Sequence, residues 1–286
     1  QITFFKVVYR RHTNFSKEAI EQTFNGSLSS GTGTLNCTLS RNGDLVQEIY
    51  LVATNSHAVD ATNAIESVEV EIGGQKIDKH YGEWLDIYNE LFETDSSHAR
   101  RLAMVAVAGK CYIPLRFWFN RNPGLALPLI ALQYHEVKIN MTIRQSVGAS
   151  TASLSDAKLL VNYLYLDTDE RRRFAQVSHE YLIEQVQHTG VETSNKVKMN
   201  FNHPVKALFW TCEADGAANG GALGTAKLQL NGHDRAAEQE ADYYHLVQPY
   251  ECGLGHSSQR DNNDRTWNNA VAKSAVTGNV GMYSFC

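Results

Sequence analysis

The sequence predicts an all-β protein made of two consecutive β-sandwiches, with short helices in the loops between strands. Three observations predict this fold class. Hydrophobic and polar residues alternate with a period of two in many short segments, and glycine-containing turns separate these segments. A unit of strand, glycine turn and helix occurs twice along the chain. The length of 286 residues suits two globular domains.

The strands are predicted where alternation places one set of side chains on a buried face. They lie at residues 34–40, 66–72, 110–119, 137–143, 158–166 and 196–201. Turn dipeptides separate the strands, because glycine accepts positive φ and proline fixes a tight turn. These dipeptides are Asn25-Gly26, Asn42-Gly43, Gly73-Gly74, Pro123-Gly124 and Asn231-Gly232.

One helix is predicted at residues 81–92. Its apolar stripe consists of Tyr81, Trp84, Leu85, Tyr88, Leu91 and Phe92. The other face carries Glu83, Asp86, Asn89 and Glu90. Asp78 precedes the helix, where its carboxylate would accept hydrogen bonds from the free amides of the first turn. We expect the stripe to pack against the first sandwich rather than to line a cofactor site.

A weak internal repeat predicts that both sandwiches share one plan. A shift of 158 residues, from Gly74 to Gly232, places residues 68–75 over residues 226–233. The second helical stripe then consists of Ala237, Ala241, Tyr244 and Val247. Charge replaces hydrophobic alternation after residue 166, which marks a boundary. We therefore predict a first domain at residues 1–166, a linker at residues 167–174 and a second domain at residues 175–286.

The charge balance argues against a protein that coats nucleic acid. The net charge is -5, whereas neutralising phosphates requires a surplus of clustered Lys and Arg. We interpret the triplet of Arg171, Arg172 and Arg173 as a solvated or ion-paired linker surface, with a site for an acidic partner as the alternative. No run of about 18 apolar residues occurs, so we expect no membrane insertion.

Cysteine usage is typical of a protein synthesised in a cytoplasm. Five cysteines are widely spaced and form no CxxC pair, so we expect reduced structural thiols. Four glycosylation sequons begin at Asn14, Asn25, Asn36 and Asn140. No secretory signal opens the sequence, so we expect the sequons to be accidental.

The search for chemistry yields no catalytic, cofactor-binding or metal-binding residue. The nucleotide-binding, hydrolase and metalloprotease motifs are absent, and His179-Glu180 lacks the second histidine of a zinc site. The eleven histidines are dispersed without ligand spacing. Acidic residues at Glu238, Glu240 and Asp242 suit a charged helix face, and Asp60 suits a loop surface. We predict that the protein is not an enzyme and needs no cofactor.

Long stretches of the chain resemble a known family. Residues 2–15 (ITFFKVVYRRHTNF) and 113–139 (IPLRFWFNRNPGLALPLIALQYHEVKI) resemble signature stretches of the major capsid proteins of nucleocytoplasmic large DNA viruses, especially those that infect algae. The resemblance continues at residues 42–51, 68–92, 167–187 and 201–210, and thus covers almost the whole chain.

The resemblance implies a double jelly roll that forms homotrimeric, pseudo-hexagonal capsomers of an icosahedral shell. The implied partners are other copies of the chain, neighbouring capsomers and minor capsid proteins, and the implied location is the virion. The glycine- and asparagine-rich loops at residues 215–224 and 252–274 would then rise on the outer face of the capsomer.

An alternative function is a sugar-binding or glycan-cleaving β-sandwich, because Trp84, Trp118, Trp210 and Trp267 would stack on sugars if exposed. Burial explains Trp84 and Trp118 more simply, whereas Trp267 lies in a polar loop.

The second sandwich is predicted to be truncated at its C-terminal end. Roughly 45 residues of strand-rich sequence follow Asn120 in the first copy of the repeat, whereas the second copy stops at Cys286. Relatives of the family continue beyond this point. We expect a complete eight-stranded first domain and a second domain that lacks about two strands.

Overall fold

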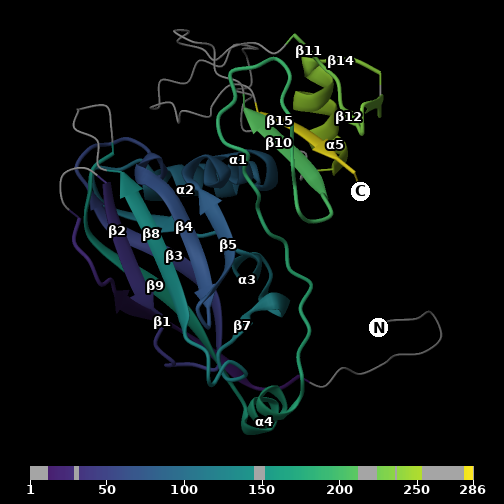
Figure 1. Ribbon diagram of the computed structural model, residues 1–286. Coiled ribbons are helices and arrows are strands. Elements are labelled where there is room, and N and C mark those ends of the chain that lie inside the picture. Colours follow the sequence, from purple (N-terminus) through teal and green to yellow (C-terminus); the bar gives the residue numbers. More distant parts are fainter. Residues whose placement is uncertain are drawn as a thin grey trace.

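The computed structural model describes residues 12–28, 32–144, 152–211, 224–235, 237–252 and 280–285. Figure 1 shows a large β-sandwich built from the first half of the chain and a smaller second unit beside its helical end. An extended segment joins them. The predicted all-β fold class with short helices between strands is confirmed.

The first sandwich consists of two antiparallel sheets. One sheet has the order β1 (Phe15–Thr23), β9 (Leu154–Leu166), β3 (Leu45–Asn55) and β6 (Gly109–Pro114), and the short β7 (Leu127–Pro128) pairs with the start of β3. The other has the order β2 (Thr32–Thr38), β8 (Val137–Arg144), β4 (Ile65–Ile72) and β5 (Gln75–Tyr81). Among the described residues, eight strands form the two sheets apart from β7, in agreement with the predicted eight-stranded first domain.

The core lies between the two sheets, where the alternating side chains meet. In β8, Val137, Ile139, Met141 and Ile143 are all buried, whereas Lys138, Asn140 and Thr142 between them are partly exposed. Burying side chains of this size contributes roughly 1.5 to 3 kcal/mol each, which makes the two inward faces the main source of stability.

Two predicted strands differ from the structure. The strand at residues 110–119 ends at Pro114, and Trp118 begins a short helix, α3 (Trp118–Arg121). Asn120 stabilises this turn by accepting from the amide of Phe117 at 3.0 Å and donating to the carbonyl of Gln47 at 2.6 Å. Residues 196–201 alternate as a strand would, but no strand pairs with them among the described residues.

Helices fill the connections at one end of the sandwich (Figure 1). The turn η1 (Ala61–Ala64) links β3 to β4, while α1 (Gly82–Phe92) and α2 (Asp95–Val105) lie between β5 and β6. The predicted helix at residues 81–92 is thus confirmed. Its predicted cap is wrong, because β5 runs on to Tyr81 and places Asp78 inside the strand.

The predicted linker is helical. The helix α4 (Thr168–Gln176) begins directly after β9, and Asp167 caps it by accepting from the amide of Thr168 at 2.8 Å. Arg171 Nε lies 3.0 Å from Asp44 Oδ1, and Arg172 and Arg173 are exposed. The triplet therefore forms the partly ion-paired surface that the sequence indicated.

The second unit contains three two-stranded sheets among its described residues. The strand β10 (Ala207–Thr211) pairs with β15 (Val280–Ser284), and β11 (Thr225–Ala226) pairs with β14 (Gln239–Glu240). The hairpin of β12 (Gln229–Leu230) and β13 (His233–Asp234) turns at Asn231 and Gly232, both at positive φ. These described residues do not close a full sandwich. The prediction of further strands beyond residue 286 stays a prediction.

The internal repeat is recognisable in both halves. A π-helical turn, η3 (Tyr243–Val247), and α5 (Gln248–Cys252) follow the second hairpin as α1 follows the first. Tyr244 is buried and its ring centroid lies 5.3 Å from that of Trp210. Ala237 lies before the helix, so the second stripe is shorter than predicted. The predicted loop at residues 215–224 lies outside the described residues except for Gly224, and that at residues 252–274 lies outside them except for Cys252.

Candidate functional site

Among the residues that the structure describes, no group of three or more His, Cys, Asp or Glu side chains could hold a metal ion. The ring of His179 stacks on Phe174, with 5.0 Å between the ring centroids, and one ring nitrogen lies 2.8 Å from the carbonyl oxygen of Phe174. None of the described helices has the length and hydropathy needed to span a bilayer. The arrangement that the structure does offer is a set of contacts between the two units.

The helix α1 lies between the two units and contacts both. On one side, Ile87 and Leu91 form a small buried cluster with Val280 and Met282 of β15. Trp84 and Phe92 extend this cluster, and their ring centroids lie 5.2 and 5.9 Å from that of Phe209 in β10. The stripe was predicted to pack against the first sandwich. This prediction is wrong for Leu91 and Phe92, which pack against the second unit, whereas Leu85 belongs to the main core and Tyr88 lies against arginines of the first sandwich.

Most of the polar face of α1 is buried too, with Glu83 as the exposed exception. Asn89 and Glu93 are 3% and 7% exposed, and both accept hydrogen bonds from Arg116, which follows β6. The guanidinium carbons of Arg116 and Arg121 lie 5.4 and 4.9 Å from the ring centroid of Tyr88. Burial lowers the pKa of Arg116, but its two acceptors and the tyrosine face keep a cation favourable there. Arg116 thus links α1 to the end of β6.

Asp60 takes part in a second buried contact to this layer. It was predicted to lie on a loop surface, but it is 3% exposed and caps η1 by accepting from the amide of Thr62 at 2.9 Å. Its other oxygen lies 3.3 Å from Nη1 of Arg101 in α2. The prediction failed because α2 folds over the loop. Glu90 of α1 lies in the same layer, and its burial raises its pKa to about 7.

The extended segment at residues 177–206 covers the open edge of β5. The amide of Val186 donates to Asp78 at 3.0 Å, and the side chain of Gln185 donates to the carbonyl of Ile77. Just before these residues, the carboxylate of Glu184 accepts hydrogen bonds from Arg121 at 2.8 Å and from Lys206. The bond from Lys206 is the main reason that the pKa of Glu184 is lowered. These side-chain contacts occupy an edge to which another strand would otherwise add.

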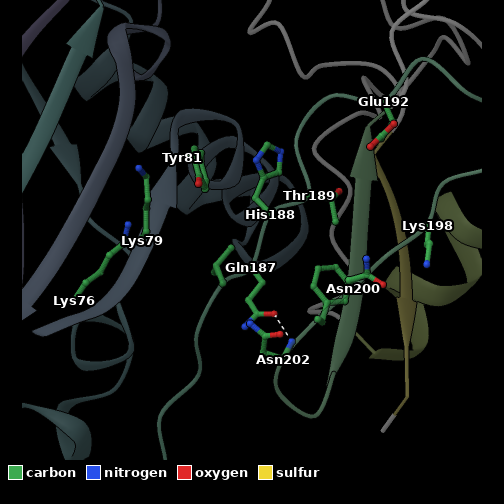
Figure 2. A pocket seen from close by; sticks show the side chains of 12 residues that line it. Lys76, Lys79, Tyr81, Gln187, His188, Thr189, Glu192, Lys198, Asn200 and Asn202 are labelled. Carbon is green, nitrogen blue, oxygen red and sulfur yellow. Dashed lines mark hydrogen bonds between the residues drawn. The ribbon is translucent and has the colours of Figure 1, made fainter.

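A polar groove opens between β5 and this segment, with a volume of about 580 Å³. Figure 2 shows Lys76, Lys79 and Tyr81 on one wall and Lys198 and Asn200 on the other. Both lysines of β5 bind Glu69, at 2.7 and 2.8 Å. The pKa of Glu69 is raised by burial but lowered more by these two bonds.

Two contacts hold the segment along the groove. The ring centroid of His188 lies 4.7 Å from that of Tyr81, and Gln187 accepts from the amide of Asn202 at 3.0 Å, which holds the returning chain. These groups position the segment against β5. The groove is therefore a mainly polar surface between β5 and the segment.

The tryptophans do not form an exposed platform for sugars. Trp118 is 5% exposed, and Trp84 and Trp210 are half-buried against aromatic neighbours. Trp267 lies outside the described residues. Stacking of sugars on aromatic faces requires exposed rings, so the three described tryptophans do not favour the glycan-binding alternative.

Sequence reasoning missed the residues that join the two units. Arg116 and Arg121 stood in a stretch predicted as a strand and its turn, and nothing in their spacing pointed to α1. No local signal was available, because the polar face of α1 has the composition of a solvated surface.

The comparisons with known proteins agree on one family. Residues 3–167 match the family described as "Major capsid protein N-terminus". Residues 170–257 match the family described as "Large eukaryotic DNA virus major capsid protein". The two matches together cover most of the chain.

Individual relatives agree with these matches. The major capsid protein of Pyramimonas orientalis virus is 51% identical, over 100% of this chain and 80% of the relative. That of Paramecium bursaria Chlorella virus 1 is 40% identical, over 88% of this chain and 73% of the relative. A solved structure titled as a quasi-atomic model of the PBCV-1 virus capsid superposes with a TM-score of 0.77 at 36% identity, covering 99% of this chain and 80% of the other.

Proposed function

Because the chain belongs to the major capsid protein family of large eukaryotic DNA viruses, we propose that it forms the capsomers of such a virus and that these build an icosahedral shell. The superposition on a capsid protein over nearly the whole chain carries this proposal. The location that follows is the virion. We also propose that the protein is synthesised in the host cytoplasm, which agrees with the free thiols of Cys37, Cys111 and Cys252.

The mechanism is geometric rather than chemical. A closed sandwich is rigid because its two sheets share a close-packed core, so its edges and loops are held in fixed directions. Two units of one plan in each of three copies would present six similar walls around one axis. Closed symmetry makes each copy meet its neighbour through the same pair of surfaces. We therefore propose a homotrimer that imitates a hexagon and contacts other capsomers and minor capsid proteins.

The contacts between the units support this role. A capsomer wall needs a fixed relation between its two sandwiches, and α1 supplies it by contacting β15 on one face and Arg116 on the other. The ion pairs from Arg121 through Glu184 to Lys206 add a second link. We place the first domain at residues 1–166, the linker at 167–174 and the second domain at 175–286. The two family matches, which meet between residues 167 and 170, support this division.

The role that we propose is structural rather than catalytic, and it includes no direct contact with the genome. The family supports the first part, and the net charge of -5 supports the second. Each contact between two capsomers can be weak, because many such contacts act together in a shell.

Cross-linking mass spectrometry on assembled shells tests the proposal. A short amine-reactive cross-linker should join lysines of different copies, identified by mixing isotope-labelled and unlabelled protein. We expect mixed-isotope cross-links that satisfy one three-fold arrangement. Cross-links explained entirely within single chains would contradict assembly.

A further inference from the structure

An exposed apolar stripe lies on the helix of the second unit. Its members are Leu246, Val247 and Tyr250, which are 43%, 41% and 78% exposed. The first two lie four and three residues before Tyr250, so each is its neighbour on the surface of η3 and α5. Among the described residues, no buried cluster includes these three side chains. We call them the second-unit stripe. Contiguous exposed apolar side chains are typical of an interaction surface.

The internal repeat relates the second-unit stripe to the residues with which α1 contacts the second unit. A shift of 159 residues, one more than separates the two glycine turns, places Leu85 over Tyr244. Each of these two side chains is buried within its own unit, so the shift aligns equivalent faces of the two helices. The same shift places two contact residues of α1 over two members of the stripe, Ile87 over Leu246 and Leu91 over Tyr250. The stripe thus occupies the positions that join α1 to the next unit along the chain.

The surface that α1 contacts is one face of the strand pair β10 and β15. Phe209 and Met282 lie opposite each other in these strands, and both pack in the cluster with α1. Trp210 is the next residue of β10, and its side chain lies on the other face, where it contacts Tyr244 of its own unit. The contact between the units therefore joins a helical stripe of one unit to the outward face of two paired strands of the other.

The first sandwich has an equivalent outward face on β3 and β6. These strands pair with each other as β10 and β15 do, and they lie at the same places before and after the hairpin and helix of the repeat. Tyr50 lies opposite Pro114, and Tyr112 lies on the same face of β6 as Pro114. These three residues are partly exposed, whereas their neighbours Leu51 and Ile113 are buried in the core. We call Tyr50, Tyr112 and Pro114 the β3–β6 face. No buried cluster among the described residues includes them.

The second-unit stripe and the β3–β6 face are bordered by opposite charges. Lys110 lies on the same face of β6 as Tyr112 and is exposed. Asp242 and Glu251 are exposed near the two ends of the helix that carries the stripe. The acidic residue beside Tyr50 is Glu48, and Lys17 pairs with it at 2.7 Å. Opposite charges around two apolar surfaces favour their association and fix its orientation.

We propose that the second-unit stripe of one copy packs on the β3–β6 face of the next copy, so that the contact between copies repeats the contact between the two units of one chain. This inference rests on the proposed capsomer and names the surfaces that join its three chains. The contact is heterologous, because a helix of one copy meets strands of another. Heterologous contacts form a ring when the rotation between neighbours closes. Six units around one axis then share one kind of joint.

Sedimentation velocity of the full chain and its variants over a range of concentrations tests this joint. Leu246→Asp and Tyr250→Asp each place a charge in the second-unit stripe. Each should raise the concentration at which the trimer dissociates by at least about tenfold. Leu182→Asp is the matched control, because it changes a leucine of the extended segment that is 92% exposed, and it should leave association unchanged. All three residues lie at the surface, so circular dichroism should show the same folded structure in every variant.

Photo-cross-linking identifies the surface that the stripe meets. A benzophenone amino acid replaces Tyr250, and these chains are assembled together with ¹⁵N-labelled unchanged chains. Irradiation followed by mass spectrometry then distinguishes contacts between copies from contacts within one chain. We expect cross-links from position 250 to labelled peptides that contain Tyr112 and Pro114.

The outcomes separate this inference from the proposed function. A trimer that both stripe variants retain at unchanged strength would overturn the inference and leave the proposed capsomer standing. Cross-links from position 250 that stay within its own chain, or that join it to a different surface of another copy, would do the same. An unchanged chain that remains monomeric at micromolar concentration would overturn the proposed capsomer and the inference together.

Discussion

Replacing Leu91 by alanine should loosen the second unit and leave the first sandwich folded. Leu91 is 3% exposed and belongs to a cluster of four buried residues between α1 and β15. Buried leucine-to-alanine changes cost about 3 to 5 kcal/mol, with smaller costs where the site can collapse. Half-buried side chains surround this small cluster, so it can close around the cavity. We expect a loss of about 2 to 3 kcal/mol.

Leu85→Ala is the matched control, because it makes the same change on the same helix. Leu85 is 1% exposed and packs in the main core, which cannot collapse easily. We expect a loss of about 3 to 5 kcal/mol there. Urea unfolding gives the two free energies, and hydrogen exchange locates them. Leu91→Ala should lose protection in β15 but not β8, and Leu85→Ala should lose it in β8. Equal losses in both strands for both variants would refute the assignment of opposite faces of α1 to different units.

Three further perturbations test other contacts. Arg101→Met leaves Asp60 as an unpaired buried charge, so urea unfolding should show a loss of about 3 to 5 kcal/mol, and Asp60→Asn added to it should recover part of this loss. Burial raises the pKa of Glu90 from 4.5 to about 7, so its protonated form stabilises the fold at low pH, and this stability is lost as pH rises through about 7. Between pH 5 and pH 8, the unfolding free energy of the unchanged chain should therefore fall by about 2 to 3 kcal/mol more than that of Glu90→Gln. Gly281→Ala would place a Cβ 2.3 Å from the ring of Trp210 and should disrupt the pairing of β10 with β15, which faster hydrogen exchange in these strands would show. Gly224→Ala is the control, because its Cβ would meet no atom within 4 Å, and it should leave hydrogen exchange unchanged.

The first sandwich could be predicted from the sequence because its strands are half-buried. In β8, alternate residues face the core, so the period of two is visible in the sequence. The turn at Gly73-Gly74 was predictable for a similar local reason, since both residues adopt positive φ. Such features depend on neighbours along the chain, which a sequence displays.

The buried polar contacts could not be predicted in this way. Asp60 becomes buried only when α2, about 40 residues later, folds over it and brings Arg101 within 3.3 Å. The polar face of α1 has the composition of a solvated surface, and only the position of Arg116 shows that it is internal. Residues 196–201 have strand periodicity, but a strand also needs a partner, which no local pattern specifies.

Sedimentation velocity of the purified chain at micromolar concentration tests the central claim most directly. We predict a single compact species with three times the mass of one chain, because the capsomer that we propose is a closed assembly of three copies. A stable monomer at that concentration would contradict it.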